Sequence, residues 1–242
     1  MPISLRDNVV VVVGASSGIG RAIAVEFARA GAKVVASARR ESRLKELQTQ
    51  LAGEGFEAYI HPADASNPPM MEGLAAAALA KYGQIDTLVY ATGTNTPDRA
   101  LTRLTPEIWD AMVSVNLNGA YYATNAVLGH MRERKRGLIF YISSRSAVAP
   151  DESGAAYQAA KRGLAGLSYA IRVEEQKNGI RTCLVCPGLT DTEIIEKRLV
   201  KPPAETMAKA LRAEDLGELV VSLARLPERA WVPEVHLFPA NI

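Results

Sequence analysis

The chain has 242 residues, enough for one large α/β domain, and 48% of them are hydrophobic, which excludes a disordered protein. A net charge of +2 gives no electrostatic basis for binding nucleic acid, and no stretch is apolar over the roughly 20 residues that a membrane span needs. Residues 1–7 lack the basic and then apolar layout of a signal peptide, so we expect a cytoplasmic protein that does not bind membranes.

A run of β-branched residues predicts the first strand over residues 8–13, buried on both faces of a parallel sheet. The glycine-rich sequence GASSGIG follows at once, and a helix over residues 21–29 comes next. In this context Gly14 permits a tight turn, Gly18 lets the backbone approach a pyrophosphate, and Gly20 lets the helix pack close to the strand. Ordinary turn glycines are the alternative, but the strand–loop–helix order favours a nucleotide site at the helix N-terminus.

Strands and helices alternate along the rest of the chain. Further strands are predicted over residues 33–37, 59–61, 85–90, 138–142, 180–185 and 235–238. Helices are predicted over residues 41–51, 70–82, 103–131, 155–177 and 213–224, with an irregular segment over 190–212. The pattern predicts a single domain, residues 1–242, of the α/β class. We expect a doubly wound parallel sheet (a Rossmann fold) of about seven strands in the order 3-2-1-4-5-6-7, with helices on both faces.

Ligands of such sheets bind at the carboxyl ends of the strands. Several chemically useful residues directly follow predicted strands and should therefore meet at one edge: the glycine loop, Arg39, Asp64, Gly93, Ser144 and Pro187-Gly188. This convergence predicts that the binding site lies at that edge.

Tyr157 and Lys161 lie one turn apart on the predicted helix, so they share a face. A lysine ammonium there favours the ionised phenol and would lower the pKa of Tyr157 toward the range useful for proton transfer. Ser144, after the adjacent strand, could hydrogen-bond the same substrate oxygen. Alone, such a pair is more often structural; the glycine loop upstream favours catalysis.

Together these motifs resemble the short-chain dehydrogenase/reductase family over residues 6–240. The resemblance implies catalytic roles for Asn116, Ser144, Tyr157 and Lys161, and Ser144 rather than Ser143 fits the family's spacing to the tyrosine. It implies hydride transfer between NADP(H) and a ketone, aldehyde or secondary alcohol. Tyr157 would move the proton, Ser144 would place the oxygen, and Lys161 would lower the tyrosine pKa and bind the nicotinamide ribose.

The resemblance also implies which residues surround the cofactor: Gly14, Ser16, Ser17, Gly18, Ile19, Gly20, Arg39, Arg40, Asp64, Ala91, Gly93, Tyr157, Lys161, Pro187, Gly188, Thr190 and Thr192. Thr94, Arg145, Val148 and Leu189 would wall the substrate pocket together with segment 190–212. No acid lies between Lys33 and Arg40 to bind a ribose 2′-hydroxyl, whereas an arginine can pair with a 2′-phosphate. We therefore expect NADP(H) rather than NAD(H), with two solvated arginines as the alternative.

Two positions depart from the family pattern. Val13 stands where the family usually has Thr, and Tyr90-Ala91-Thr92-Gly93 stands where it usually has Asn-Asn-Ala-Gly. Both changes remove polar groups and alter local hydrogen bonding. The family also implies a homodimer or homotetramer through the helices over 103–131 and 155–177. Small residues on the second helix allow such contact, although packing on the chain's own sheet explains them equally well: Ala159, Gly163, Ala165 and Gly166.

Other functions remain open. A 3-oxoacyl thioester reductase or a hydroxy-acid dehydrogenase would use the same residues, and a nucleotide-binding regulatory protein without catalysis would use the same fold. Cys183 and Cys186 have a Cys-x-x-Cys spacing, but they belong to a predicted buried strand, where thiols are ordinary core residues. The three histidines show no ligand spacing, so we expect no metal.

Overall fold

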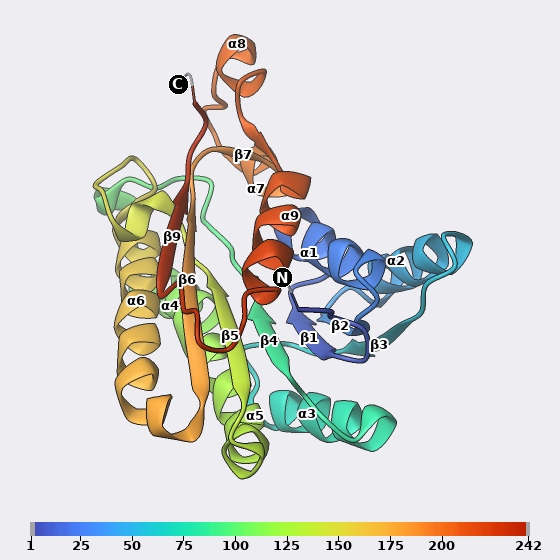
Figure 1. Ribbon diagram of the computed structural model, residues 1–242. Helices are drawn as coiled ribbons and strands as arrows, with labels where there is room; N and C mark the ends of the chain where they lie inside the picture. The colour runs from blue at the N-terminus through green and yellow to red at the C-terminus, as the bar shows by residue number, and fades with distance from the viewer. Residues whose placement is uncertain (1–2, 241–242) are drawn as a thin grey trace.

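The computed structural model describes residues 3–240, and the ends of the predicted domain, residues 1–2 and 241–242, lie outside the described part. Seven parallel strands form one sheet in the order β3-β2-β1-β4-β5-β6-β9 (Figure 1), which confirms the predicted order. The strands are β1 (Val9–Val13), β2 (Lys33–Ala38), β3 (Ala58–Pro62), β4 (Thr87–Tyr90), β5 (Gly137–Ile142), β6 (Ile180–Pro187) and β9 (Glu234–Leu237).

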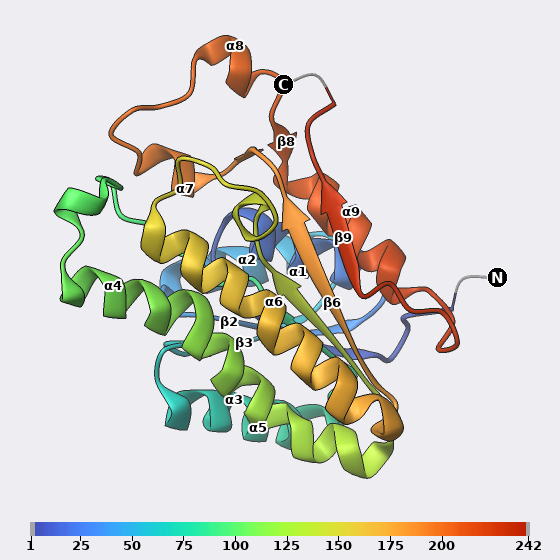
Figure 2. The same ribbon diagram turned by 90° about the vertical axis from the view of Figure 1, so that its left-hand side faces the viewer.

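Helices cover both faces of this sheet (Figures 1 and 2). One layer contains α1 (Gly18–Arg29), α2 (Glu41–Gly53) and α9 (Ala213–Ala224). The other contains α3 (Pro68–Tyr82), α4 (Pro106–Val113), α5 (Gly119–Arg134) and α6 (Ala155–Glu175). Short 3₁₀ turns are Leu101–Arg103, Arg145–Ala147 and Gln176–Asn178. None of the helices in residues 3–240 is long and apolar enough to cross a membrane.

Strand β1 shows why the first predicted strand has no polar position. Val10 and Val12 pack into the layer of α1, α2 and α9, whereas Val9, Val11 and Val13 pack into the layer of α3, α5 and α6. Every side chain of a central parallel strand is thus buried on one face or the other. Val13 stands where the family usually has Thr. The turn that follows it is still held by hydrogen bonds, because the Ser37 carbonyl accepts from the N–H groups of Gly14 and Ala15.

The predicted helix over residues 103–131 is wrong at its start. Arg103 ends a 3₁₀ turn, and α4 begins after Thr105, whose hydroxyl accepts from the N–H of Ile108 (3.3 Å) with Pro106 in the first helical position. A π-helical turn, Ser114–Asn118, then joins α4 to α5. The Tyr90 hydroxyl donates to the carbonyl of Val115 in that turn (2.6 Å), so the departure at Tyr90 supplies a hydrogen bond of its own.

The segment predicted as irregular, residues 190–212, contains four short elements. Strands β7 (Thr190–Asp191) and β8 (Leu211–Arg212) pair with each other, and α7 (Glu193–Glu196) and α8 (Ala204–Met207) lie between them. Figure 2 shows this segment beyond the carboxyl end of β6. It therefore stands over the edge where the predicted site residues meet.

Candidate active site

A cleft of about 780 Å³ opens at the carboxyl edge of the sheet, between the glycine loop and segment 190–212. Of the predicted site residues, all except Asn116 and Val148 line it. The topology therefore brings together residues from positions 14 to 192, as the convergence of strand ends predicts.

The glycine loop forms a surface of bare backbone on one side of the cleft. Gly14 and Gly18 have φ values of +99° and +53°, which side chains rarely adopt. A Cβ on Gly20 would lie 2.3 Å from the Gly14 carbonyl oxygen, so only glycine fits there. Ser17 precedes α1 without capping it through its side chain, which leaves the first N–H groups of the helix without that partner. This cradle fits the pyrophosphate of a dinucleotide.

Ser144, Tyr157 and Lys161 meet across the cleft from the glycine loop. The Ser144 hydroxyl is within hydrogen-bonding reach of the Tyr157 hydroxyl, and Lys161 Nζ lies 5.7 Å from the centre of the tyrosine ring. Lys161 is buried and donates to the carbonyl of Ile142 (3.0 Å). Ser143 instead donates to the backbone carbonyl of Lys161 (3.1 Å), a contact that anchors α6 to β5.

The protonation of this cluster differs from the prediction. Burial raises the pKa of Tyr157 above its ordinary value, against the opposing effect of the Ser144 hydrogen bond. Burial also lowers the pKa of Lys161 to about 8. The predicted lowering of the Tyr157 pKa is therefore wrong for this structure, because loss of hydration outweighs the neighbouring charges.

Asn116 lies behind the cleft wall rather than on it. Its Nδ2 donates to the carbonyls of Met112 (2.9 Å) and Thr94 (3.0 Å), and its Oδ1 accepts from the N–H of Thr94 (3.2 Å). The side chain sits beside Gly93, where a Cβ would lie 3.3 Å from Asn116 Oδ1 and 3.4 Å from Lys161 Nζ. The π-helical turn thus fastens the segment after β4 next to the lysine.

A hydrogen-bond chain that the sequence does not signal lies behind Ser144. The Ser144 hydroxyl donates to Ser146 Oγ (3.1 Å), and Ser146 Oγ donates to the Asp151 carboxylate (2.6 Å). Asp151 also accepts from the N–H of Ser153 (2.8 Å). In the sequence these are ordinary turn residues. In the structure they orient the hydroxyl of Ser144.

Val148 was predicted in the substrate pocket but does not line the cleft. The 3₁₀ turn Arg145–Ala147 buries Ser146 and Ala147 and leaves Val148 38% exposed. Residues within one tight turn point in different directions, so proximity in sequence to Ser144 does not place a side chain in the cleft. Arg145 and Leu189 do line it, as does Thr94.

The two arginines after β2 behave differently. Arg40 donates to the hydroxyls of Ser17 (2.7 Å) and Ser16 (3.1 Å) and pairs with Glu193 of α7 (2.9 Å). Arg39 is more exposed and lies 4.0 Å from the Asp64 carboxylate. Arg40 therefore connects the glycine loop directly to segment 190–212.

The cysteine pair is divided by the sheet. Cys183 packs in the layer of α1, α2 and α9, whereas Cys186 packs in the opposite layer. Burial raises the pKa of both thiols to about 12. A joint redox site is excluded because the two side chains face opposite sides of β6.

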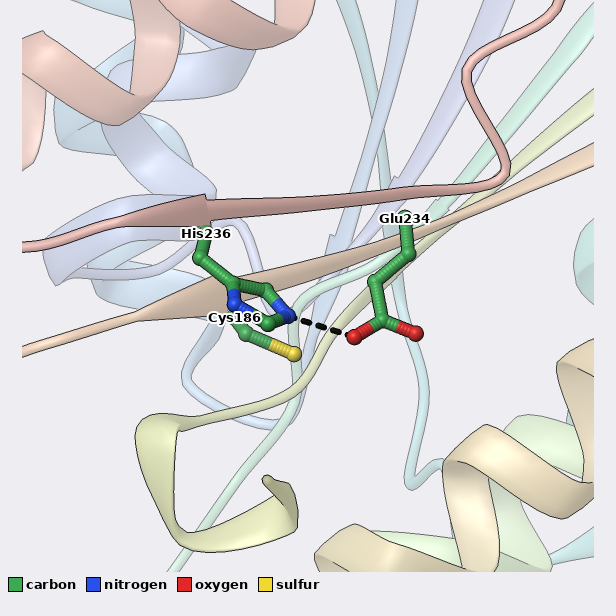
Figure 3. A group of neighbouring side chains, drawn as sticks. All are labelled: Cys186, Glu234 and His236. Carbon is green, nitrogen blue, oxygen red and sulfur yellow. Dashed lines mark hydrogen bonds and ion pairs between the residues drawn. The ribbon is translucent and has the colours of Figure 1, made fainter. Parts of the chain in front are cut away.

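Cys186 instead neighbours Glu234 and His236 on the adjacent strand β9 (Figure 3). The sulfur, carboxylate and imidazole ligand atoms lie within 4.8 Å of one another, and His236 Nε2 is 2.5 Å from Glu234 Oε1. In residues 3–240 this is the one group of three such side chains that could hold a metal ion together. The strand pairing between β6 and β9 creates it, and no spacing in the sequence signals it.

The sheet order, the glycine cradle and the Ser-Tyr-Lys cluster define the class of dinucleotide-binding oxidoreductases. The chain belongs to the short-chain dehydrogenase family, whose model, described as short chain dehydrogenase, matches residues 8–202. An uncharacterized oxidoreductase of Staphylococcus saprophyticus is 32% identical over 242 residues, covering 98% of this chain and 99% of that protein.

Two solved structures extend the likeness. A metagenomic short-chain oxidoreductase in complex with NADP shares 32% identity and a TM-score of 0.85, over 99% of this chain and 100% of that one. A variant of actinorhodin polyketide ketoreductase with NADPH shares 29% identity and a TM-score of 0.87, over 98% and 97%. The family and the Rossmann fold expected from the sequence are thereby confirmed, and the protein is an oxidoreductase of this family.

Proposed function

We propose that the protein is an NADP(H)-dependent reductase of ketones or aldehydes, or equally a dehydrogenase of secondary alcohols. The observation that carries this proposal is the meeting of Ser144, Tyr157 and Lys161 in one cleft with the glycine cradle. A bound nicotinamide supplies or takes up the hydride, and the protein's task is to position the substrate and move the proton.

Each side chain has a role in that task. The Tyr157 hydroxyl gives its proton to the carbonyl oxygen, or takes one from the alcohol. The N–H of Ser146 holds Ser144 Oγ in place (3.2 Å), and the Ser144 hydroxyl turns its hydrogen from Ser146 Oγ to the same substrate oxygen. With a pKa of about 8, Lys161 is mostly protonated at neutral pH, so its ammonium can donate hydrogen bonds to the hydroxyl groups of the nicotinamide ribose. Asn116 keeps the loop at Gly93 next to Lys161.

The preference for NADP(H) rests on the end of β2. Arg39 and Arg40 line the cleft beside the glycine loop, and a guanidinium pairs with a 2′-phosphate through charge-assisted hydrogen bonds. The solved relatives that contain NADP or NADPH support the same choice. The ring end of the dinucleotide would lie against Pro187, Gly188, Thr190 and Thr192 on the other side of the cleft.

A 3-oxoacyl thioester reductase is the second candidate. It is supported by the likeness to actinorhodin polyketide ketoreductase. The same catalytic residues would serve, because the group that is reduced in a 3-oxoacyl thioester is also a ketone carbonyl.

We also propose a homodimer or homotetramer formed through α4, α5 and α6. These helices expose large apolar side chains, namely Trp109, Tyr121, Tyr169 and Val173. Packing within the chain explains the glycine at position 163, since a Cβ there would lie 2.6 Å from Leu117. A Cβ on Gly166 would have nothing within 4 Å, so packing within the chain does not require that glycine. Light scattering at micromolar concentration should show an oligomer, and a stable monomer would refute this proposal.

The central experiment compares Tyr157→Phe with the wild type in an NADPH oxidation assay. A screen of ketones, aldehydes, oxo acids and 3-oxoacyl thioesters first identifies a substrate. Loss of the hydroxyl should lower kcat by about 10²–10⁴-fold, since general acid–base help is of that size, with NADPH binding nearly unchanged. Tyr169→Phe on the same helix is the matched control, because its hydroxyl contacts Glu234 outside the cleft. Retention of more than about a third of kcat would refute the role of Tyr157.

A further inference from the structure

Two further arginines line the same cleft as Tyr157. Arg99 comes from the loop after β4, and Arg198 follows α7 in segment 190–212. Among the ion pairs of residues 3–240, neither has a carboxylate partner. The Nε of Arg198 is buried without a hydrogen-bond partner, and Nε of Arg99 makes one long contact, to the Thr96 carbonyl (3.5 Å). Two partly buried guanidinium groups are thus left with unused donors.

In the described part of the chain, the positive charges of Arg99 and Arg198 are not balanced by an ion pair with a carboxylate. Burial lowers the pKa of Arg99, and repulsion by Arg198 lowers it further, so the two groups are close enough to disfavour each other. Asp151 offsets part of this repulsion, but its oxygens accept from Ser146 Oγ (2.6 Å) and from the N–H of Ser153 (2.8 Å). Glu152 also lines the cleft, and within residues 3–240 neither acid forms an ion pair with Arg99 or Arg198. A partly buried charge without an ion partner is unfavourable, and a second like charge in the same cleft makes it more so. An anion between them would relieve both effects.

We propose that Arg99 and Arg198 bind the carboxylate of the substrate, which makes the substrate class a short oxo acid or the corresponding hydroxy acid. This inference rests on the proposed function, because it places the reacting carbonyl at Tyr157. A guanidinium presents paired N–H donors that match the two oxygens of a carboxylate. Arg99, Arg198 and Tyr157 line the same cleft, so one small substrate can present its carboxylate to the arginines and its carbonyl group to Tyr157.

The test compares an acid with its neutral ester. Wild-type protein with NADPH is assayed on acetoacetate and on methyl acetoacetate, alongside Arg99→Met and Arg198→Met. We expect wild type to favour the acid by about 10- to 150-fold in kcat/KM, the range that hydrogen bonds to charged groups provide. Each variant should lose most of that preference while its kcat/KM for the ester changes little. Lys201→Met is the matched control, since Lys201 pairs with Glu196 on the same segment and does not line the cleft.

A binding measurement separates this inference from the proposed function. Calorimetry of the NADPH-loaded protein with malonate, an unreactive dicarboxylate, should show binding that Arg198→Met weakens by about 10-fold or more. Equal kcat/KM for acid and ester, or tighter binding of inorganic phosphate than of malonate, would overturn the carboxylate site. Failure to turn over any carbonyl would overturn the proposed function instead, and malonate binding would then decide the anion site alone. Because two separate arginines are tested, misfolding of one variant leaves the other to decide.

Discussion

The two walls of the cleft are built on different principles. On the glycine-loop wall, backbone packs against backbone, with Gly14 and Gly20 at distances that exclude any Cβ. On the wall formed by segment 190–212, short elements are held by polar and charged side chains, such as the Arg40–Glu193 pair between the two walls. The first wall has one permitted conformation, whereas the second depends on contacts that a bound anion can exchange. We therefore expect the glycine-loop wall to be rigid and the wall of segment 190–212 to be more adjustable.

A substitution at Gly20 should disrupt the glycine-loop wall most strongly. Gly20→Ala places a methyl group 2.3 Å from the Gly14 carbonyl oxygen, so the loop or α1 must shift. We expect a loss of about 1–3 kcal/mol or more of unfolding free energy, as for other overpacked sites, together with loss of NADPH binding. Chemical denaturation and NADPH fluorescence measure both. Gly73→Ala in α3 is the control: nothing lies within 4 Å, and it should stabilise the protein by about 0.5–1 kcal/mol. Similar behaviour of the two variants would contradict this view of the loop.

The buried Lys161 should make the stability of the protein depend on pH. Burial lowers the pKa of Lys161 from 10.5 to about 8, so between these pH values the folded protein binds fewer protons than the unfolded chain. Stability therefore rises with pH across this window, by up to about 1.4 kcal/mol per pH unit from this group. Below pH 8 the full cost of burying the charge is present.

Lys161→Met removes that contribution. The difference in unfolding free energy, wild type minus variant, should increase as pH rises from 8 to 10.5. It is measured by denaturation without cofactor. Comparing the two proteins cancels the opposite trend of Cys183 and Cys186, whose raised pKa values reduce stability as pH rises. A constant difference across the window would show that Lys161 keeps its ordinary pKa.

The preference for NADPH over NADH tests the role of the residues that end β2, beside the glycine loop. Ala38→Asp combined with Arg39→Ala adds an acid for a ribose 2′-hydroxyl and removes a partner for a 2′-phosphate. The ratio of kcat/KM for NADPH over NADH should fall by about 10- to 150-fold. Wild-type protein that uses NADH as well as NADPH would contradict the assignment before any variant is made.

A modest change in NADPH affinity is expected when the ion pair between the two walls is removed. Glu193 pairs with Arg40 at 2.9 Å and with Arg43 at 3.9 Å. If the proposed 2′-phosphate binds these guanidinium groups, Glu193 would compete with it. Glu193→Gln should tighten NADPH binding by about 2- to 5-fold, because exposed ion pairs contribute about 0.2–1 kcal/mol. Glu205→Gln, which removes an exposed carboxylate near Lys209 in α8, is the control. Weaker NADPH binding by Glu193→Gln would mean that the pair builds the site rather than competing with it.

Local sequence determined the parts of this protein whose geometry is local. The valine run specifies a strand buried on both faces, the glycine spacing specifies a turn into a helix, and four-residue spacing puts Tyr157 and Lys161 on one helical face. Alternation of strands and helices then limits the topology, because crossover connections are right-handed and ligands bind at one edge. These inferences need only neighbours in the chain and general rules of packing.

Tertiary structure decided whatever depends on side chains that are distant in sequence or on the exact direction of a turn. The arginines at positions 99 and 198 line one cleft only because the loop after β4 and segment 190–212 lie over the same strand ends. The Tyr90 hydroxyl reaches the carbonyl of Val115 because the π-helical turn places that carbonyl beside it. Val148 lies outside the cleft because the 3₁₀ turn before it directs its side chain elsewhere. The pKa of Tyr157 likewise follows from burial, which no spacing reveals. Burial and long-range contacts are properties of the packed chain, so the sequence pattern could not predict them.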